Sequence, residues 1–343
     1  MDRQRNSTLD IMKGIGIILM MLAHLVFTQG MSKQIIHSFH MPLFFILAGV
    51  FAKDILDISS YRQFTVKNAR RLLLPYFVTM MMLCAWGAIQ TIAKYDISYF
   101  LRHLLSMLSA SADGWDTQWG LIYAGPMWFL IALFAVREIF VGIQYVCRHV
   151  HERYKDLLIF CISVALSVIS VYVHPLLPSL PFCIMQAFTA IAFYAIGWYM
   201  HRHPMPWWGY GLSILAWPFA ILYGSIELES AYLAYYPLSF IGACGGTYAL
   251  YLLCKGIAKI HEFVNSINIK HHTLNIPSPL AWCGLYSLPI LCMHDLEMYS
   301  DIMYSIKCRI PSIAVAMGYG EIVIAIVMTI IVINIPYIKK IYR

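Results

Sequence analysis

Three ionisable side chains interrupt the first long apolar stretch of the sequence: Asp10, Lys13 and His24. A helix turns by about 100° per residue, so Lys13 and His24 would share one face, with a rise of about 16 Å between them. Asp10 lies one turn from Lys13 and can pair with it. The imidazole could serve as a general base, and the charged pair could shape a polar path. The structural alternatives are a packing role for His24 and snorkelling of the charged pair to the interface.

Two more histidines, His37 and His40, follow shortly after His24. Their spacing of three residues predicts a shared helix face, and the short preceding loop places His40 at a depth similar to that of His24. Histidine is the commonest metal ligand, but no carboxylate or thiolate completes a recognisable ligand spacing here. We therefore predict acid–base chemistry and no metal.

A cationic cluster, Lys67, Arg70 and Arg71, precedes the third apolar stretch. Such a cluster at the cytoplasmic mouth of a helix suits phosphate capture, although basic residues also anchor ordinary membrane helices. Arg137 and Glu138 lie inside the fourth stretch, where we expect a buried and mainly structural ion pair.

Several candidates lie near the predicted outer side. His294 and Glu321, in the last two apolar stretches, could face one outer cavity. Residues 115–119 read Trp-Asp-Thr-Gln-Trp, which could stack on and hydrogen-bond a sugar. The alternative for this segment is an interfacial aromatic belt.

The composition narrows the architecture that must position these residues. Of 343 residues, 60% are hydrophobic and 12% are charged, against about 25% charged in a typical soluble domain. A disordered chain, a coiled coil and a nucleic-acid binder are excluded. Continuous apolar runs predict membrane-crossing helices rather than alternating strands. We predict an all-α, polytopic membrane protein with a single domain, 1–343, and ten spans: 9–29, 35–52, 72–93, 126–147, 157–173, 180–200, 207–224, 232–254, 280–297 and 313–335.

The distribution of basic residues predicts the orientation. With a cytoplasmic N-terminus, 17 of the 24 Lys and Arg residues fall in inner segments and 5 in outer segments, as the positive-inside rule requires. Both termini are therefore predicted to be cytoplasmic. Asp10 and Lys13 favour an uncleaved first span over a signal peptide. The nine cysteines are odd in number and form no CxxC, so we interpret them as packing residues.

Five motifs, in order along the chain, resemble those of the integral-membrane acyltransferase 3 family, most closely its short, fucose-4-O-acetylase-like branch. They are the basic-x10-His pattern of Lys13 and His24, the run Phe-His-Met-Pro-Leu-Phe-Phe-Ile-Leu-Ala-Gly at 39–49, the R-x-x-R-like segment at 67–70, Trp-Phe-Leu at 128–130, and the segment from Tyr286 to His294.

This resemblance implies an enzyme of the plasma (inner) membrane that transfers an acyl group, usually acetyl from acetyl-CoA, to a hydroxyl of an envelope carbohydrate or lipid-linked glycan. It places the essential histidine at His24 and its basic partner at Lys13. We count Asp10 and His40 with this catalytic group. The acyl-CoA contacts fall on Lys67 and Arg70. Lysine at the first position loses bidentate geometry, so Arg71 could substitute. The substrate candidates are His37, Trp128, His294 and Glu321.

A transporter or flippase for a lipid-linked sugar is the alternative function. Ten helices and intramembrane charges are compatible with it, but the sequence shows no repeat and no paired broken helices. A membrane sensor is a third alternative, which nothing specific supports. The rise of about 16 Å from Lys13 to His24 is comparable to a pantetheine arm and favours direct transfer. Sugar identity, hydroxyl position and oligomeric state stay open.

Overall fold

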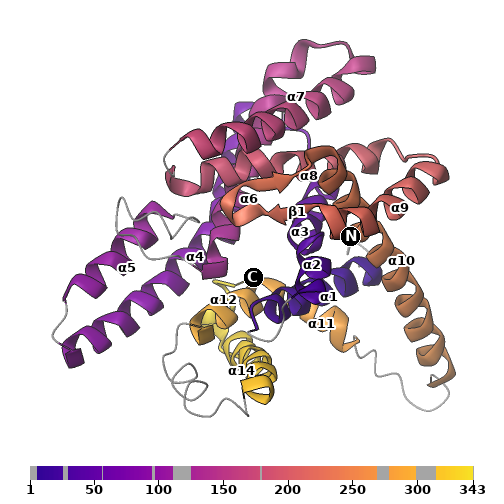
Figure 1. Ribbon diagram of the computed structural model, residues 1–343. Coiled ribbons are helices and arrows are strands. Elements are labelled where there is room, and N and C mark those ends of the chain that lie inside the picture. Colours follow the sequence, from indigo (N-terminus) through magenta and orange to yellow (C-terminus); the bar gives the residue numbers. More distant parts are fainter. Residues whose placement is uncertain are drawn as a thin grey trace.

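The computed structural model describes residues 6–25, 30–55, 57–94, 97–110, 125–177, 180–268, 278–298 and 314–342, and most of them are helical (Figure 1). The predicted all-α class is confirmed with one addition. A short antiparallel hairpin joins β1 (Ser225–Glu227) to β2 (Tyr232–Ala234), with Ile226 paired to Leu233. This hairpin occupies the start of the predicted span 232–254, which is therefore wrong at that end.

A helix overlaps each of the ten predicted ranges. The helices are α1 (Ser7–Ala23), α2 (Met31–His37), α3 (His40–Val50), α4 (Ile58–Lys94), α5 (Ile97–Ser109), α6 (Trp128–Val146), α7 (Glu152–Val173), α8 (Ile184–Arg202), α9 (Trp207–Tyr223), α10 (Tyr236–Asn268), α11 (Pro279–Leu285), α12 (Ser287–Met298), α14 (Ala314–Asn334) and α15 (Pro336–Lys339). Short 3-10 turns are η1 (Gly125–Met127), η2 (Cys147–His149), η3 (His174–Leu176), η4 (Pro181–Cys183) and η5 (Leu228–Ser230).

Five helical segments of the described chain are long and apolar enough to cross a membrane. They are Ile58–Ile89, Gly125–His149, Glu152–Leu176, Pro181–Arg202 and Tyr236–Val264. The protein is thus a multi-pass membrane protein. Ten crossings and two cytoplasmic termini stay predictions.

Two predicted spans are interrupted, which the sequence did not indicate. The range 35–52 divides into α2 and α3 at Ser38 and Phe39, and the range 280–297 divides into α11 and α12 at Tyr286. The sequence showed no paired broken helices, and the two interrupted ranges, the second and the ninth, are not corresponding positions of two five-span halves. α4 begins at Ile58, so the basic cluster lies inside this helix rather than before it.

The buried core contains an aromatic cluster where α6 meets α8. The Phe140 ring lies edge-on to Tyr194, with 5.0 Å between ring centroids, and to Trp198 at 5.3 Å. All three side chains are fully or almost fully buried. By contrast α9, at the right-hand edge of Figure 1, exposes large apolar side chains such as Leu215 and Phe219. An apolar surface of this kind suits contact with lipid.

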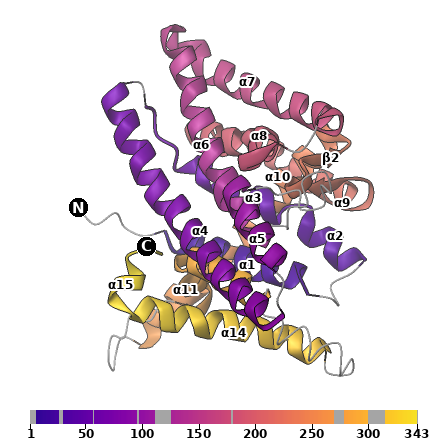
Figure 2. The same cartoon turned by 90° about the vertical axis from the view of Figure 1, so that its left-hand side faces the viewer.

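The crossing of α1 and α11 is close because both helices carry glycine there. A β-carbon on Gly284 would overlap the backbone of Asp10, and one on Gly14 would overlap the backbone of Leu280. Small residues allow helix backbones in a membrane to approach this closely. The crossing fixes α1 and its polar side chains against α11 and α12. Figure 2 shows α14 running along the side of the molecule where α1 and α11 lie.

We expect Gly284→Leu to destabilise the protein by about 1–3 kcal/mol or more, because an inserted side chain must push α1 away. Thermal unfolding of the purified protein in detergent measures this effect. The matched control is Gly256→Leu in α10, where an added β-carbon meets no atom within 4 Å, and it should unfold like the wild type. Equal melting temperatures for Gly284→Leu and the wild type would contradict the close crossing.

Candidate active site

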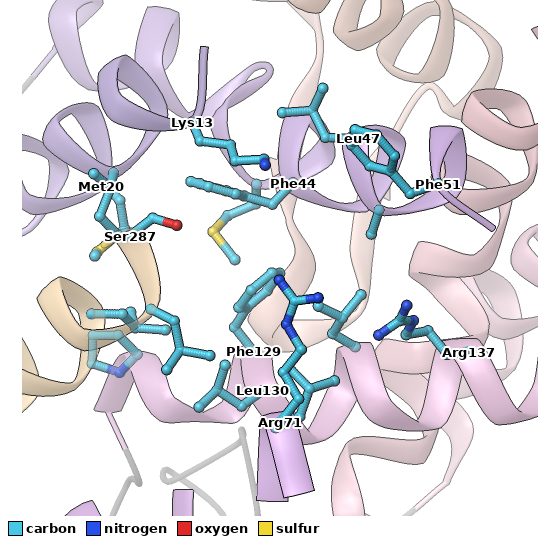
Figure 3. A pocket seen from close by; sticks show the side chains of 18 of the residues that line it. Lys13, Met20, Phe44, Leu47, Phe51, Arg71, Phe129, Leu130, Arg137 and Ser287 are labelled. Atoms are coloured by element: carbon cyan, nitrogen blue, oxygen red, sulfur yellow. The ribbon is translucent and has the colours of Figure 1, made fainter. Parts of the chain in front are cut away.

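A cavity of about 1210 Å³ lies between α1, α3, α4, α6 and the α11–α12 pair, and the hairpin contributes to its wall (Figure 3). Its lining comes from segments that are far apart in the sequence. The β1 strand contacts α2, so the hairpin lies toward the part of the cavity that the histidines line. The cavity therefore gathers most of the polar residues that the sequence singled out.

One face of α1 lines the cavity. Asp10, Lys13, Ile17, Met20 and His24 all belong to the lining, with the spacing of three and four residues that one helix face requires. Lys13 and His24 therefore lie on one face, as their spacing predicts. The Nζ of Lys13 lies 3.6 Å from Oδ1 of Asp10, which is the expected pair, and 5.5 Å from the ring centroid of Phe51.

The second group in the lining consists of imidazoles. His24, His37 and His40 all line the cavity. Protein surrounds the His24 ring on most sides, yet the residue keeps an accessible surface because it faces this cavity. The His37 and His40 rings lie edge to face, with 5.1 Å between centroids. In the described part of the chain, no group of three or more His, Cys, Asp and Glu residues could hold a metal ion.

A cationic group forms another part of the lining. Lys67 and Arg71, one turn apart on α4, belong to it together with Arg137 of α6. Figure 3 shows Lys13, Arg71 and Arg137 extending toward the same space. Neither Lys67 nor Arg71 forms an ion pair with the described residues. Arg70 lies outside this cavity and lines a separate, more open groove along α4 that it shares with Lys67.

The predicted ion pair between Arg137 and Glu138 is not formed. Arg137 Nη1 donates to Oδ1 of Asn68 at 2.8 Å, and Nδ2 of Asn68 donates to Oε1 of Glu138 at 3.0 Å. Thr65 donates a further hydrogen bond to Oε2 of Glu138 at 2.8 Å. Neighbouring residues on a helix point in different directions, so the amide of Asn68 bridges the two charges. This bridge holds Arg137 toward the cavity.

The remaining candidates divide between the cavity and its surroundings. Trp128 lines the cavity, whereas His294 and Glu321 are buried and do not. His294 lies behind His24, with 5.8 Å between ring centroids, and its Nδ1 is 3.9 Å from Oε2 of Glu297. Neither His294 nor Glu321 therefore contacts the space that His24 lines, and whether they face another outer cavity stays a prediction. The Trp-Asp-Thr-Gln-Trp segment at 115–119 lies outside the described residues.

Sequence reasoning missed several polar residues of the site, and four of them matter for its chemistry. Arg137 was assigned to a structural pair, and Ser287, Glu227 and Glu229 were given no role, although all four line the cavity. Nothing in the local sequence signalled the hairpin that carries the two glutamates. Asp295 was also missed. It is fully buried, and neither of its carboxylate oxygens has a hydrogen-bond partner among the described residues.

A family model described as an acyltransferase domain matches residues 6–338, which is nearly the whole chain. No curated protein and no solved structure matches the chain.

Proposed function

This chain belongs to the acyltransferase family whose model spans residues 6–338, and from that premise we propose that it transfers acetyl from acetyl-CoA to a hydroxyl of an envelope carbohydrate. The family makes the protein a membrane acyltransferase. The donor, the acceptor and the residue roles below are our proposal. The observation that carries it is one cavity whose lining includes cations on α4 and α6 and imidazoles on α1, α2 and α3.

The cations supply the donor site. Coenzyme A carries several phosphate groups, and guanidinium groups bind phosphate through charge-assisted hydrogen bonds. Arg71 and Arg137 face the cavity without a carboxylate bonded to either guanidinium in the described part of the chain. Lys67 lies one turn of α4 away from Arg71, toward the predicted cytoplasmic side. A polyanion there would meet positive charge that the protein leaves uncompensated.

The cavity-lining face of α1 extends from the donor site to the reacting centre. Lys13 and His24 are about 16 Å apart along this helix, a length that a pantetheine arm can span. Between them, Ile17 and Met20 give the lining an apolar stretch. An extended arm would therefore present its thioester near His24, which favours direct transfer over an acyl-enzyme. Asp10 positions the Lys13 ammonium, and neither is close enough to orient His24.

His24 acts as the general base in this proposal. The hydroxyl oxygen of the acceptor attacks the thioester carbonyl carbon while the imidazole takes the hydroxyl proton. The C–S bond then breaks, and the imidazolium returns this proton to the leaving sulfur. The products are an O-acetyl ester and the free thiol of CoA. The acceptor reaches His24 from the side of the hairpin, where Glu227 and Glu229 can accept hydrogen bonds from its hydroxyls.

Comparison of envelope glycans from cells with and without the protein tests this function. We expect mass spectrometry to show an O-acetyl group, lost on mild alkaline treatment, only when the protein is present. The same glycan should reach the cell surface in both cases, because the protein modifies the acceptor and does not export it. Identical acetylation in both samples would overturn the proposal, and loss of the whole glycan would favour a flippase.

A further inference from the structure

The interruption between α2 and α3 creates an unusual environment for His40. Phe39, with φ −149°, leaves the helical conformation between α2 and α3. The carbonyl of Ile36 accepts a hydrogen bond from the Phe39 amide at 3.3 Å and contacts Nδ1 of His40 at 2.8 Å. The break therefore brings a backbone carbonyl against the ring of the first residue of α3.

Neighbouring groups hold this break in place. Trp217 of α9 donates from Nε1 to Oγ of Ser38 at 2.8 Å, and Ser38 donates to the carbonyl of Ile35 at 2.7 Å. The Phe39 ring lies edge-on to Trp217, with 5.4 Å between centroids. The His40 residue itself is 4% exposed. The position of the imidazole is thus fixed, because the irregular turn at Ser38 and Phe39 is bonded to α9.

The contact with Ile36 assigns the tautomer of His40. A carbonyl oxygen can only accept, so Nδ1 must carry the proton, and in a neutral ring Nε2 then carries the lone pair. His40 lines the cavity, and the only hydrogen bond of its ring to the described residues is the one through Nδ1. His24, in contrast, makes no hydrogen bond to the described residues, so no such partner fixes its tautomer.

We propose that Nε2 of His40 is a fixed acceptor that binds a hydroxyl of the carbohydrate and orients the sugar toward His24. This inference rests on the proposed function and adds to it a division of labour. His24 exchanges the proton, and His40 holds the sugar. The ligand is a polyol ring with a hydroxyl that donates to His40 and a second hydroxyl that reacts at His24. An ionised phosphate of the donor cannot donate a hydrogen bond to this lone pair, whereas a free sugar hydroxyl can.

Two replacements of His40 separate this role from others. In His40→Asn the side-chain amide can still donate to the Ile36 carbonyl, but nothing occupies the position of Nε2. In His40→Gln the longer side chain can place an amide oxygen near that position. We expect His40→Asn to lower kcat/KM for the carbohydrate about tenfold, as loss of one hydrogen bond predicts, and His40→Gln to recover part of it. KM for acetyl-CoA and the pH profile of kcat should stay those of the wild type.

The controls distinguish the possible failures. His201→Asn changes an exposed imidazole near the end of α8 and should leave kcat/KM for the carbohydrate at the wild-type value. If His40→Asn keeps the wild-type kinetics, the inference is overturned. The proposed function still stands in that case, because the wild type transfers acetyl. A higher KM for acetyl-CoA in His40→Asn would overturn the inference, because it would place His40 at the donor. A shifted pH profile of kcat that His40→Gln does not restore would also overturn it, because His40 would then be the base. Absence of transfer by the wild type would instead refute the proposed function.

Discussion

Replacement of His24 with alanine is expected to lower the rate of acetyl transfer by about 10²–10⁴-fold, the usual contribution of a general base. The imidazole faces the cavity at the end of the cavity-lining face of α1, and no hydrogen bond to the described residues ties up either ring nitrogen. Without it, the hydroxyl would have to attack the thioester before losing its proton. The loss should appear in kcat, because His24 contributes little to binding of the donor.

The measurement is the initial rate of transfer by purified variants with acetyl-CoA and the carbohydrate acceptor. His201→Ala, which removes an exposed imidazole near the end of α8, is the matched control and should keep the wild-type rate. Export of the acceptor to the cell surface should continue in cells that carry His24→Ala. Retained acetylation in that variant would refute the assignment of His24, and loss of export would favour a flippase.

Replacement of Arg71 with glutamine is expected to lower kcat/KM for acetyl-CoA by about 10–100-fold. A hydrogen bond to a charged group contributes roughly 1.5–3 kcal/mol, and Arg71 is a cavity cation without an ion-pair partner among the described residues. Arg70→Gln is the matched control, because the Arg70 side chain lines the separate groove along α4 and not the cavity. It removes the same charge from the adjacent position of the same helix and should have little effect.

A donor without phosphates sharpens the test of Arg71. S-acetylpantetheine keeps the thioester and the arm but lacks the nucleotide, so Arg71→Gln and the wild type should use it equally well. Steady-state kinetics of the wild type and Arg71→Gln with both donors form a thermodynamic cycle. Its coupling energy measures the contact between Arg71 and phosphate. Equal defects with the two donors would mean that Arg71 acts on the fold or on the reacting groups instead.

The sequence predicted most reliably where one helix face carried the information. The 11-residue separation of Lys13 and His24 was enough to place both on one face, because α1 is regular between them. The second and ninth spans were predicted less well. Their interruptions at Ser38 and Tyr286 depend on contacts with other helices, such as the bond from Trp217 to Ser38, and local sequence does not record those partners.

The sequence also did not predict the directions in which side chains on apolar helices point. Arg137 was expected to pair with Glu138 because they are adjacent, but adjacent residues diverge on a helix, and Asn68 of α4 decides where both groups point. In the same way, the sequence brought Lys67, Arg70 and Arg71 together as one cluster. The helix separates the two arginines, since Arg71 faces the cavity and Arg70 faces the separate groove along α4.

The most direct test of the account is transfer by the purified protein in proteoliposomes, supplied with radiolabelled acetyl-CoA and carbohydrate extracted from the envelope of the source cells. We expect label on the carbohydrate, bound as an ester that mild alkali releases, with the wild-type protein and only a trace with His24→Ala. The proposed mechanism is contradicted if the wild type leaves the carbohydrate unlabelled, or if His24→Ala labels it at the wild-type rate.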